Sequence, residues 1–80
     1  MSEDKLRCAM LEIATEARLD GIEFCAKMAR ELADVFTASA SASDAAGDEK
    51  ASHTFKASAG TLTFYADELA SVVARKRAGR

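Results

Sequence analysis

The sequence predicts an all-α fold in a single domain of residues 1–80, on three observations. Proline, the strongest helix breaker, is absent, and glycine occurs only four times. Alanine, the best helix former, is frequent. The β-branched and aromatic residues are scattered, without the alternating runs that are typical of strands.

The first predicted element is a helical arm over about 3–37. Ser2 suits an N-cap position, and the acidic residues Glu3 and Asp4 suit the positive end of the helix dipole. An apolar stripe at helical spacing follows, formed by Leu6, Met10, Ile13 and Ala17.

A kink or break is predicted near 20–21. Downstream, the apolar residues are Ile22, Cys25, Met28 or Ala29, Leu32 and Phe36. On a helical projection this second stripe is rotated by roughly 85° from the first. Gly21 also costs about 1 kcal/mol inside a helix relative to alanine. A continuous helix from residue 3 to 37 is the competing interpretation.

A loop over about 38–47 and a helix over about 48–77 complete the chain. The loop prediction depends on the small, polar segment TASASASDAAGDE. The predicted core stripe of the last helix consists of Phe55, Ala59, Leu62, Ala66, Leu69 and Val73, with Tyr65 and Val72 at its edge. The basic residues that end the sequence are Arg75, Lys76, Arg77 and Arg80. We expect them to complement the helix dipole.

The predicted architecture is an antiparallel helical hairpin with a kinked or broken first arm. The core of an 80-residue chain is usually marginal without disulfides, a metal or a partner subunit, and two helices cannot cover both apolar stripes well. We therefore expect a homodimer, a four-helix bundle that buries the Leu6–Ile13 and Leu62–Leu69 stripes. If the first arm breaks at Gly21, a monomeric three-helix bundle is the alternative.

Composition argues against several classes of function. The chain has 13 acidic and 11 basic residues and no basic stripe, so no nucleic-acid partner is expected. No apolar run approaches the length of a membrane span, and we expect no membrane association and a cytoplasmic location.

Neither a metal nor another cofactor is expected. A structural zinc site needs four ligands, whereas the chain has only Cys8, Cys25 and His53 as cysteine or histidine candidates. We expect the two cysteines to be reduced and buried or half-buried. No glycine-rich phosphate loop is present, and no enzymatic activity is expected. The acidic residues Glu12, Glu16, Asp20 and Glu23 are interpreted as a solvated face of the first arm.

The candidate site lies on the last helix, opposite its core stripe. The residues that share this face are His53, Lys56, Ala57, Gly60 and Phe64. Small residues leave space around the imidazole, and a phenylalanine out of phase with the core indicates a contact surface. The sequence therefore predicts a non-enzymatic interaction module, an adaptor, subunit or inhibitor, that self-associates and binds a protein partner through this face.

The segment from His53 to Leu62, HTFKASAGTL, resembles the phosphoacceptor segment of histidine-containing phosphotransfer domains. That family carries a histidine, a lysine three residues later and then small residues on an exposed helical face. Ala57 stands where the family has a glycine. The resemblance implies an alternative function, in which His53 accepts a phosphoryl group and Lys56 steadies its charge.

Overall fold

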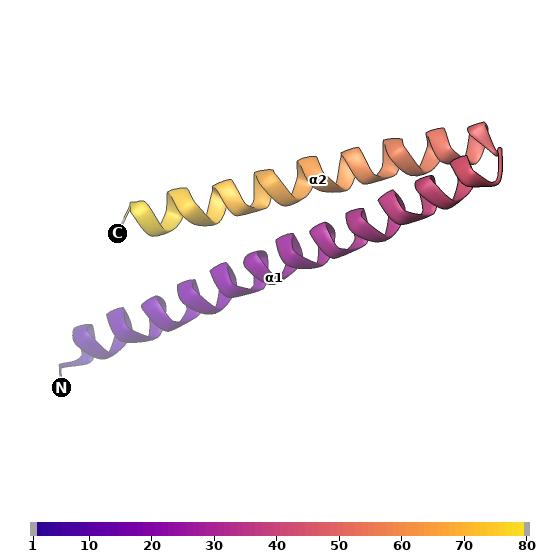
Figure 1. The fold of residues 1–80 in the computed structure, drawn as a ribbon. Coiled ribbons are helices and arrows are strands. Elements are labelled where there is room, and N and C mark those ends of the chain that lie inside the picture. The colour runs from indigo at the N-terminus through magenta and orange to yellow at the C-terminus, as the bar shows by residue number, and fades with distance from the viewer. Residues whose placement is uncertain (1, 80) are drawn as a thin grey trace.

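The computed structural model describes residues 2–79 as a hairpin of two antiparallel α-helices (Figure 1). The first helix, α1, spans Glu3–Ala45, and the second, α2, spans Glu49–Ala78. No strand occurs among the described residues. The all-α class is therefore confirmed, and the molecule is a rod with principal extents of 68 × 16 × 12 Å.

Helix α1 begins where the sequence predicts, because the Ser2 hydroxyl accepts a hydrogen bond from the Lys5 amide at 3.3 Å. It then runs through Gly21 without interruption. The predicted break near 20–21 is wrong, and so is the three-helix bundle that depended on it. A single helical glycine costs only about 1 kcal/mol relative to alanine, and the good helix formers on either side outweigh that cost.

Most of the predicted loop over 38–47 is also helical, since α1 continues to Ala45. The prediction was wrong because it took small residues as a sign of a loop. Ala40 is only 2% exposed, and the Thr37 hydroxyl donates to the Ala33 carbonyl oxygen at 2.9 Å inside the helix. Burial of alanine stabilises this segment as helix, although serine and threonine have modest helix propensity.

The connection between the helices is a tight turn at residues 46–48. The Asp48 amide donates to the Ser43 carbonyl at 2.9 Å, and the Gly47 amide donates to the Asp44 carbonyl at 3.1 Å. This pair of hydrogen bonds is a Schellman termination, which needs a residue in the left-handed conformation. Gly47 meets this need with a φ of 77°, and Asp48 then caps α2.

The helices meet along a seam whose buried residues recur every seven positions, as in an antiparallel coiled coil. In α1 the buried residues are Leu19, Ala26, Ala33 and Ala40. In α2 they are Ser52, Ala59, Ala66 and Val73. Five of these eight residues are alanine, so the layer between the helices is thin. Beside it the Phe36 and Phe55 rings stack with their centroids 5.9 Å apart.

The predicted phase of α2 is confirmed. The three small positions of the predicted stripe, Ala59, Ala66 and Val73, are buried, and the larger Phe55, Leu62 and Leu69 are half-buried. At the edge of the stripe Val72 is half-buried, whereas Tyr65 is 57% exposed. Leu62 and Leu69 thus pack within the hairpin, which limits what they could contribute to a dimer.

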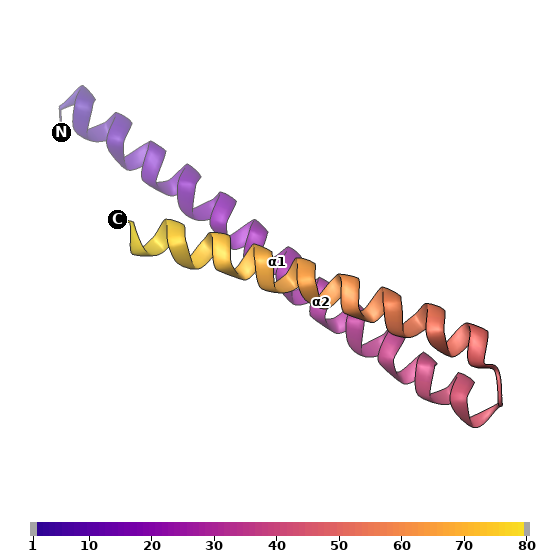
Figure 2. The same cartoon turned by 90° about the horizontal axis from the view of Figure 1, so that it is seen from above.

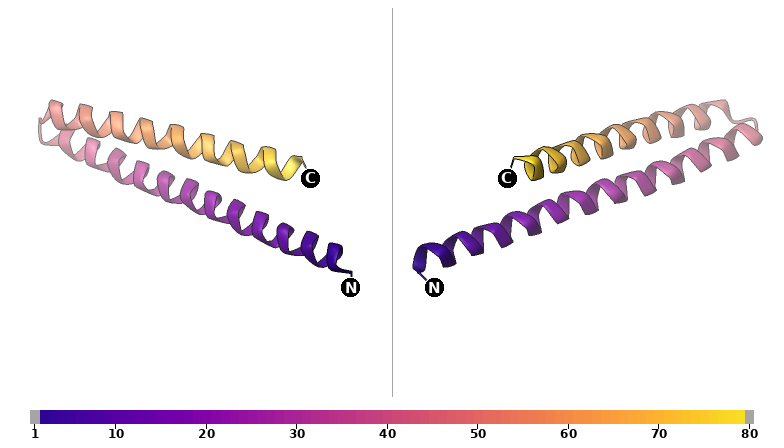
Figure 3. Two further views of the ribbon diagram at one scale, coloured as in Figure 1. Left: turned by 180° about the vertical axis from the view of Figure 1, so that it is seen from behind. Right: turned by 60° about the vertical axis from the view of Figure 1, so that its left-hand side comes forward.

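Helix α1 extends beyond the end of α2. The two helices have 43 and 30 residues, a difference of about 20 Å in length. From the turn towards the termini the helices diverge, and the N-terminal part of α1 has no helix beside it (Figures 1 and 3). Seen from above, the helices cross at a shallow angle (Figure 2). The predicted stripe of Leu6, Met10 and Ile13 therefore has no partner on α2.

The left-handed turn residue should be sensitive to a side chain. We expect Gly47→Ala to lower the free energy of unfolding by about 1–2 kcal/mol, because a non-glycine residue is strained at positive φ. Gly60→Ala is the matched control. A Cβ at Gly60 meets nothing within 4 Å, and alanine should stabilise the helix by roughly 0.5–1 kcal/mol. Urea denaturation measures both changes, and equal effects would contradict the turn geometry.

The thin seam should not accept a larger residue. We expect Ala33→Leu to lower the free energy of unfolding by about 1–3 kcal/mol, because added methyl groups force the close-packed helices apart. Ala38→Leu, the same change at an exposed position of the same helix, should alter it by less than about 0.5 kcal/mol. Thermal denaturation followed by circular dichroism compares the two. A harmless Ala33→Leu would mean that the helices do not meet at this residue.

Candidate functional site

The predicted face on α2 is exposed along its whole length. All of its residues are solvent-accessible, namely His53, Lys56, Ala57, Gly60 and Phe64. Phe64 is 62% exposed, and its ring lies edge-on to the neighbouring Tyr65 ring, with the centroids 6.2 Å apart. We call this set of five residues the α2 face. Its exposure agrees with the sequence, and its role in binding stays a prediction.

The polar end of the α2 face is tied to the end of α1. Lys56 Nζ lies 3.3 Å from the Asp44 carboxylate, across the turn. The Ser52 hydroxyl, followed by Lys56, lowers the pKa of Asp44 below its ordinary value. Ser52 is buried and meets no acceptor at full hydrogen-bonding geometry, so it acts on Asp44 as a nearby dipole. The His53 side chain makes no hydrogen bond or ion pair with any residue in the described part of the chain.

The lowered pKa of Asp44 has a definite consequence for stability. Because the pKa is lower in the folded state than in the unfolded state, ionised Asp44 stabilises the fold at neutral pH. This stabilisation is lost as the pH falls through the folded-state pKa. Its size is small, since both Asp44 and Lys56 are largely exposed and solvent screens their charges.

A second face, on α1, carries large apolar residues away from α2. Its residues follow one line along the helix, and they are Leu6, Met10, Ile13, Ala17, Phe24, Met28 and Val35. We call this set the outer stripe. Its six large side chains are between 47% and 70% exposed. The 30 residues from Leu6 to Val35 make about eight turns, so the stripe stays on one side of a straight helix.

The sequence predicts only part of the outer stripe, namely Leu6 to Ala17 and Met28, whereas Phe24 and Val35 belong to neither predicted stripe. The predicted downstream stripe mixed two faces: Ile22, Ala29 and Phe36 are half-buried in the seam, whereas Cys25, Met28 and Leu32 are exposed. Helix α1 has apolar residues on two sides. The predicted downstream stripe combined residues from both sides because it assumed a single apolar face. Ala26, Ala33 and Ala40 recur every seven residues in the seam, and this repeat distinguishes the seam from the outer stripe in the sequence.

Arg77, near the end of α2, binds an acidic cluster on α1. Its guanidinium lies 3.0 Å from Asp20 and 3.7 Å from Glu16, and it also bonds to Glu23. These three carboxylates lie on the solvent-exposed face that the sequence predicts, with side chains 40–69% exposed, and the arginine pairs with them at the point where α2 ends. Glu12 lies one turn before the cluster and is exposed, as predicted.

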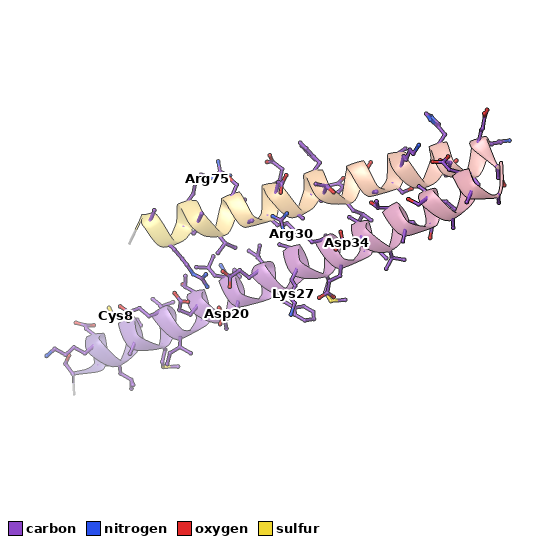
Figure 4. The ribbon with its side chains drawn as sticks, in the orientation of Figure 1. Cys8, Asp20, Lys27, Arg30, Asp34 and Arg75 are labelled. Atoms are coloured by element: carbon purple, nitrogen blue, oxygen red, sulfur yellow. The ribbon has the colours of Figure 1, made fainter. Side chains whose placement is uncertain are left out.

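A second interhelical ion pair lies nearer the middle of the rod. Arg30 Nη1 is 3.0 Å from the Asp67 carboxylate. Figure 4 shows Arg30 reaching into the space between the helices, whereas Arg75 points away from α1. The Arg77 cluster thus links the helices near the end of α2, and the Arg30–Asp67 pair links them nearer the middle. Arg80, the last residue of the basic tail, lies outside the described residues.

The remaining predicted features concern cysteines, metals and membranes. Cys8 and Cys25 are free, but both are exposed, which corrects the expected burial. Both lie on α1, about 25 Å apart along the helix axis, so they cannot form a disulfide within one chain. Among residues 2–79 no group of three potential metal ligands occurs. Neither helix offers, over the same residues, a segment long and apolar enough to cross a bilayer.

Comparisons with known proteins add no identification. No protein-family model matches the chain, and neither a curated protein nor a solved structure shows significant similarity to it.

The Arg77 cluster should contribute measurably to stability. We expect Arg77→Met to lower the free energy of unfolding by about 1 kcal/mol, because the change leaves three carboxylates without their cation. The loss should shrink in 1 M salt, where exposed charges are screened over about 3 Å. Arg75→Met, which removes an arginine that points away from α1, is the control. A similar loss in both variants would mean that Arg77 acts only through the helix dipole.

Proposed function

We propose that this protein is a non-enzymatic helical interaction module that self-associates and presents the α2 face to a protein partner. The observation that carries the proposal is the outer stripe, a long apolar surface that the hairpin leaves uncovered. Its six large side chains are between 47% and 70% exposed. Such a surface on a monomer favours association with another helix.

The size of the outer stripe supports this proposal. Six large apolar side chains, each at least 47% exposed, lie in one line on α1, whereas contiguous exposed apolar patches on monomers are small. A stable complex buries about 800 Å² on each partner. A stripe that runs from Leu6 to Val35 offers a long surface for such a contact. The dimer expected from the sequence is therefore retained, but through α1 instead of the Leu62–Leu69 stripe.

The α2 face supports a separate contact with a different protein. Phe64 presents an aromatic ring to solvent, and aromatic side chains dominate the binding energy of many interfaces. The outer stripe and the α2 face are on different helices, so a dimer built on one leaves the other open. The identity of the partner and the cytoplasmic location stay predictions from the sequence.

Histidine phosphotransfer is the second candidate function. The exposed His53, the open space around Gly60 and Lys56 three residues after the histidine favour it. A dimer of two-helix hairpins would also supply four helices. Against it, the Lys56 ammonium is paired with Asp44. Acid-labile phosphate on His53 after incubation with a phosphorylated receiver domain, absent in His53→Gln, would establish this function in place of the adaptor.

Self-association should depend on the outer stripe. Sedimentation equilibrium at micromolar concentration should give twice the chain mass. The double change Phe24→Ser and Met28→Ser should weaken the dimer by at least about a hundredfold, because each side chain contributes about 1.5–3 kcal/mol when buried. Circular dichroism should show that the variant is still helical.

Phe64→Ser is the control on the α2 face. It removes a ring of similar exposure, and it should leave both the dimer and the melting temperature nearly unchanged. A monomer at every concentration, or a dimer that only Phe64→Ser disrupts, would overturn the assignment of self-association to α1.

A further inference from the structure

We infer that the outer stripe binds the outer stripe of a second copy in antiparallel orientation, with the two-fold axis beside Asp20 and Gly21. This inference rests on the self-association proposed above and specifies its partner and register. Each chain would then keep its own hairpin seam, and the two α1 helices would cross at their midpoint.

The order of residues along the outer stripe carries this inference. Three pairs lie at equal distances on either side of a point midway between Asp20 and Gly21. These pairs are Leu6 with Val35, Ile13 with Met28, and Ala17 with Phe24. An antiparallel two-fold arrangement therefore places these six apolar residues against apolar residues of the second copy. Met10 has Leu32, one residue beyond the matching position, as its nearest apolar counterpart.

Side-chain size favours antiparallel over parallel pairing. In the antiparallel register Phe24 meets Ala17 of the second copy, so large and small residues alternate and fill the space evenly. A parallel pair would put Phe24 against Phe24 and Ala17 against Ala17 of the second copy. That arrangement crowds one layer and leaves a gap in another, and close-packed interfaces accept neither.

Gly21 marks the place where the two helices would come closest. A Cβ on Gly21 meets no atom within 4 Å, so nothing inside the hairpin requires a glycine there. The residue nevertheless costs the helix about 1 kcal/mol relative to alanine. A backbone that approaches from outside would explain its presence, because glycine allows close contact between helices.

The unequal lengths of the helices support the same orientation. The segment of α1 that extends past α2 carries Leu6 and Ile13. In the antiparallel register this segment packs on Met28 and Val35 of the second copy. These two residues lie in the part of α1 that packs against α2 within the second copy. In a parallel pair the two N-terminal segments would pack only against each other, with no α2 helix beside either of them.

Disulfide trapping tests the register. Two chains are made on the background Cys8→Ser and Cys25→Ser, one with Ile13→Cys and one with Met28→Cys, and one is isotopically labelled. After mixing and mild oxidation, the mixed disulfide should exceed either homodisulfide by about tenfold, since only adjacent Cβ atoms can be bridged. Mass spectrometry of the intact products identifies each species. A mixture of Ile13→Cys with Val35→Cys is the mismatched control, and it should form little mixed disulfide.

A second variant tests the crossing point without cysteine chemistry. Gly21→Leu should raise the dimer dissociation constant by at least about tenfold, because it forces the helices apart. Gly60→Leu, at the other open helical glycine, should leave the constant unchanged.

The outcomes separate the inference from the proposal on which it rests. Homodisulfides between chains carrying Ile13→Cys would show a parallel pair. A dimer without any disulfide at these positions, or one indifferent to Gly21→Leu, would show a different surface. In all three cases the register is overturned while self-association stands. A monomer by sedimentation overturns both.

Discussion

The small side chains buried between the two helices constrain the rest of this molecule. Alanine at most buried positions lets the backbones approach closely, but each alanine removes little apolar surface from water. The stability of the hairpin therefore depends on the half-buried rings and leucines beside the seam and on the interhelical ion pairs. A rod this thin buries few large side chains, and Leu19 is the largest among the buried residues that the structure describes. Large apolar side chains remain on the outside of α1, where they form the outer stripe.

Much of α2 could be predicted from the sequence because its two seam positions differ in character. Phe55, Leu62 and Leu69 define the stripe, and the smaller residues between them fix its phase. The phase of α2 in turn predicts which residues are exposed, and so it places His53 and Phe64 correctly on the opposite side. The N-cap at Ser2 was also predictable, since capping depends on neighbouring residues alone.

Helix α1 could not be predicted in the same way. Its seam consists mainly of alanine, a residue that is common in cores, on surfaces and in flexible segments alike. Only the seven-residue repeat of Ala26, Ala33 and Ala40 distinguishes the seam in the sequence. The contact of Arg77 with Asp20 depends on where the turn falls and on the relative lengths of the helices. Neither is local information. The sequence therefore predicts the acidic residues as a solvated face, which they are, but it does not predict their ion pairs with Arg77.

The single tight turn at Gly47 has a consequence for how the rod forms. Contacts near the turn close short stretches of chain, whereas the contact between Asp20 and Arg77 closes a stretch of 57 residues. The entropy cost of loop closure is therefore smallest for the seam contacts nearest the turn. Each seam contact that forms shortens the loop that the next one must close. The chain can close like a zipper from the Schellman turn outwards, and its free ends open first when it melts.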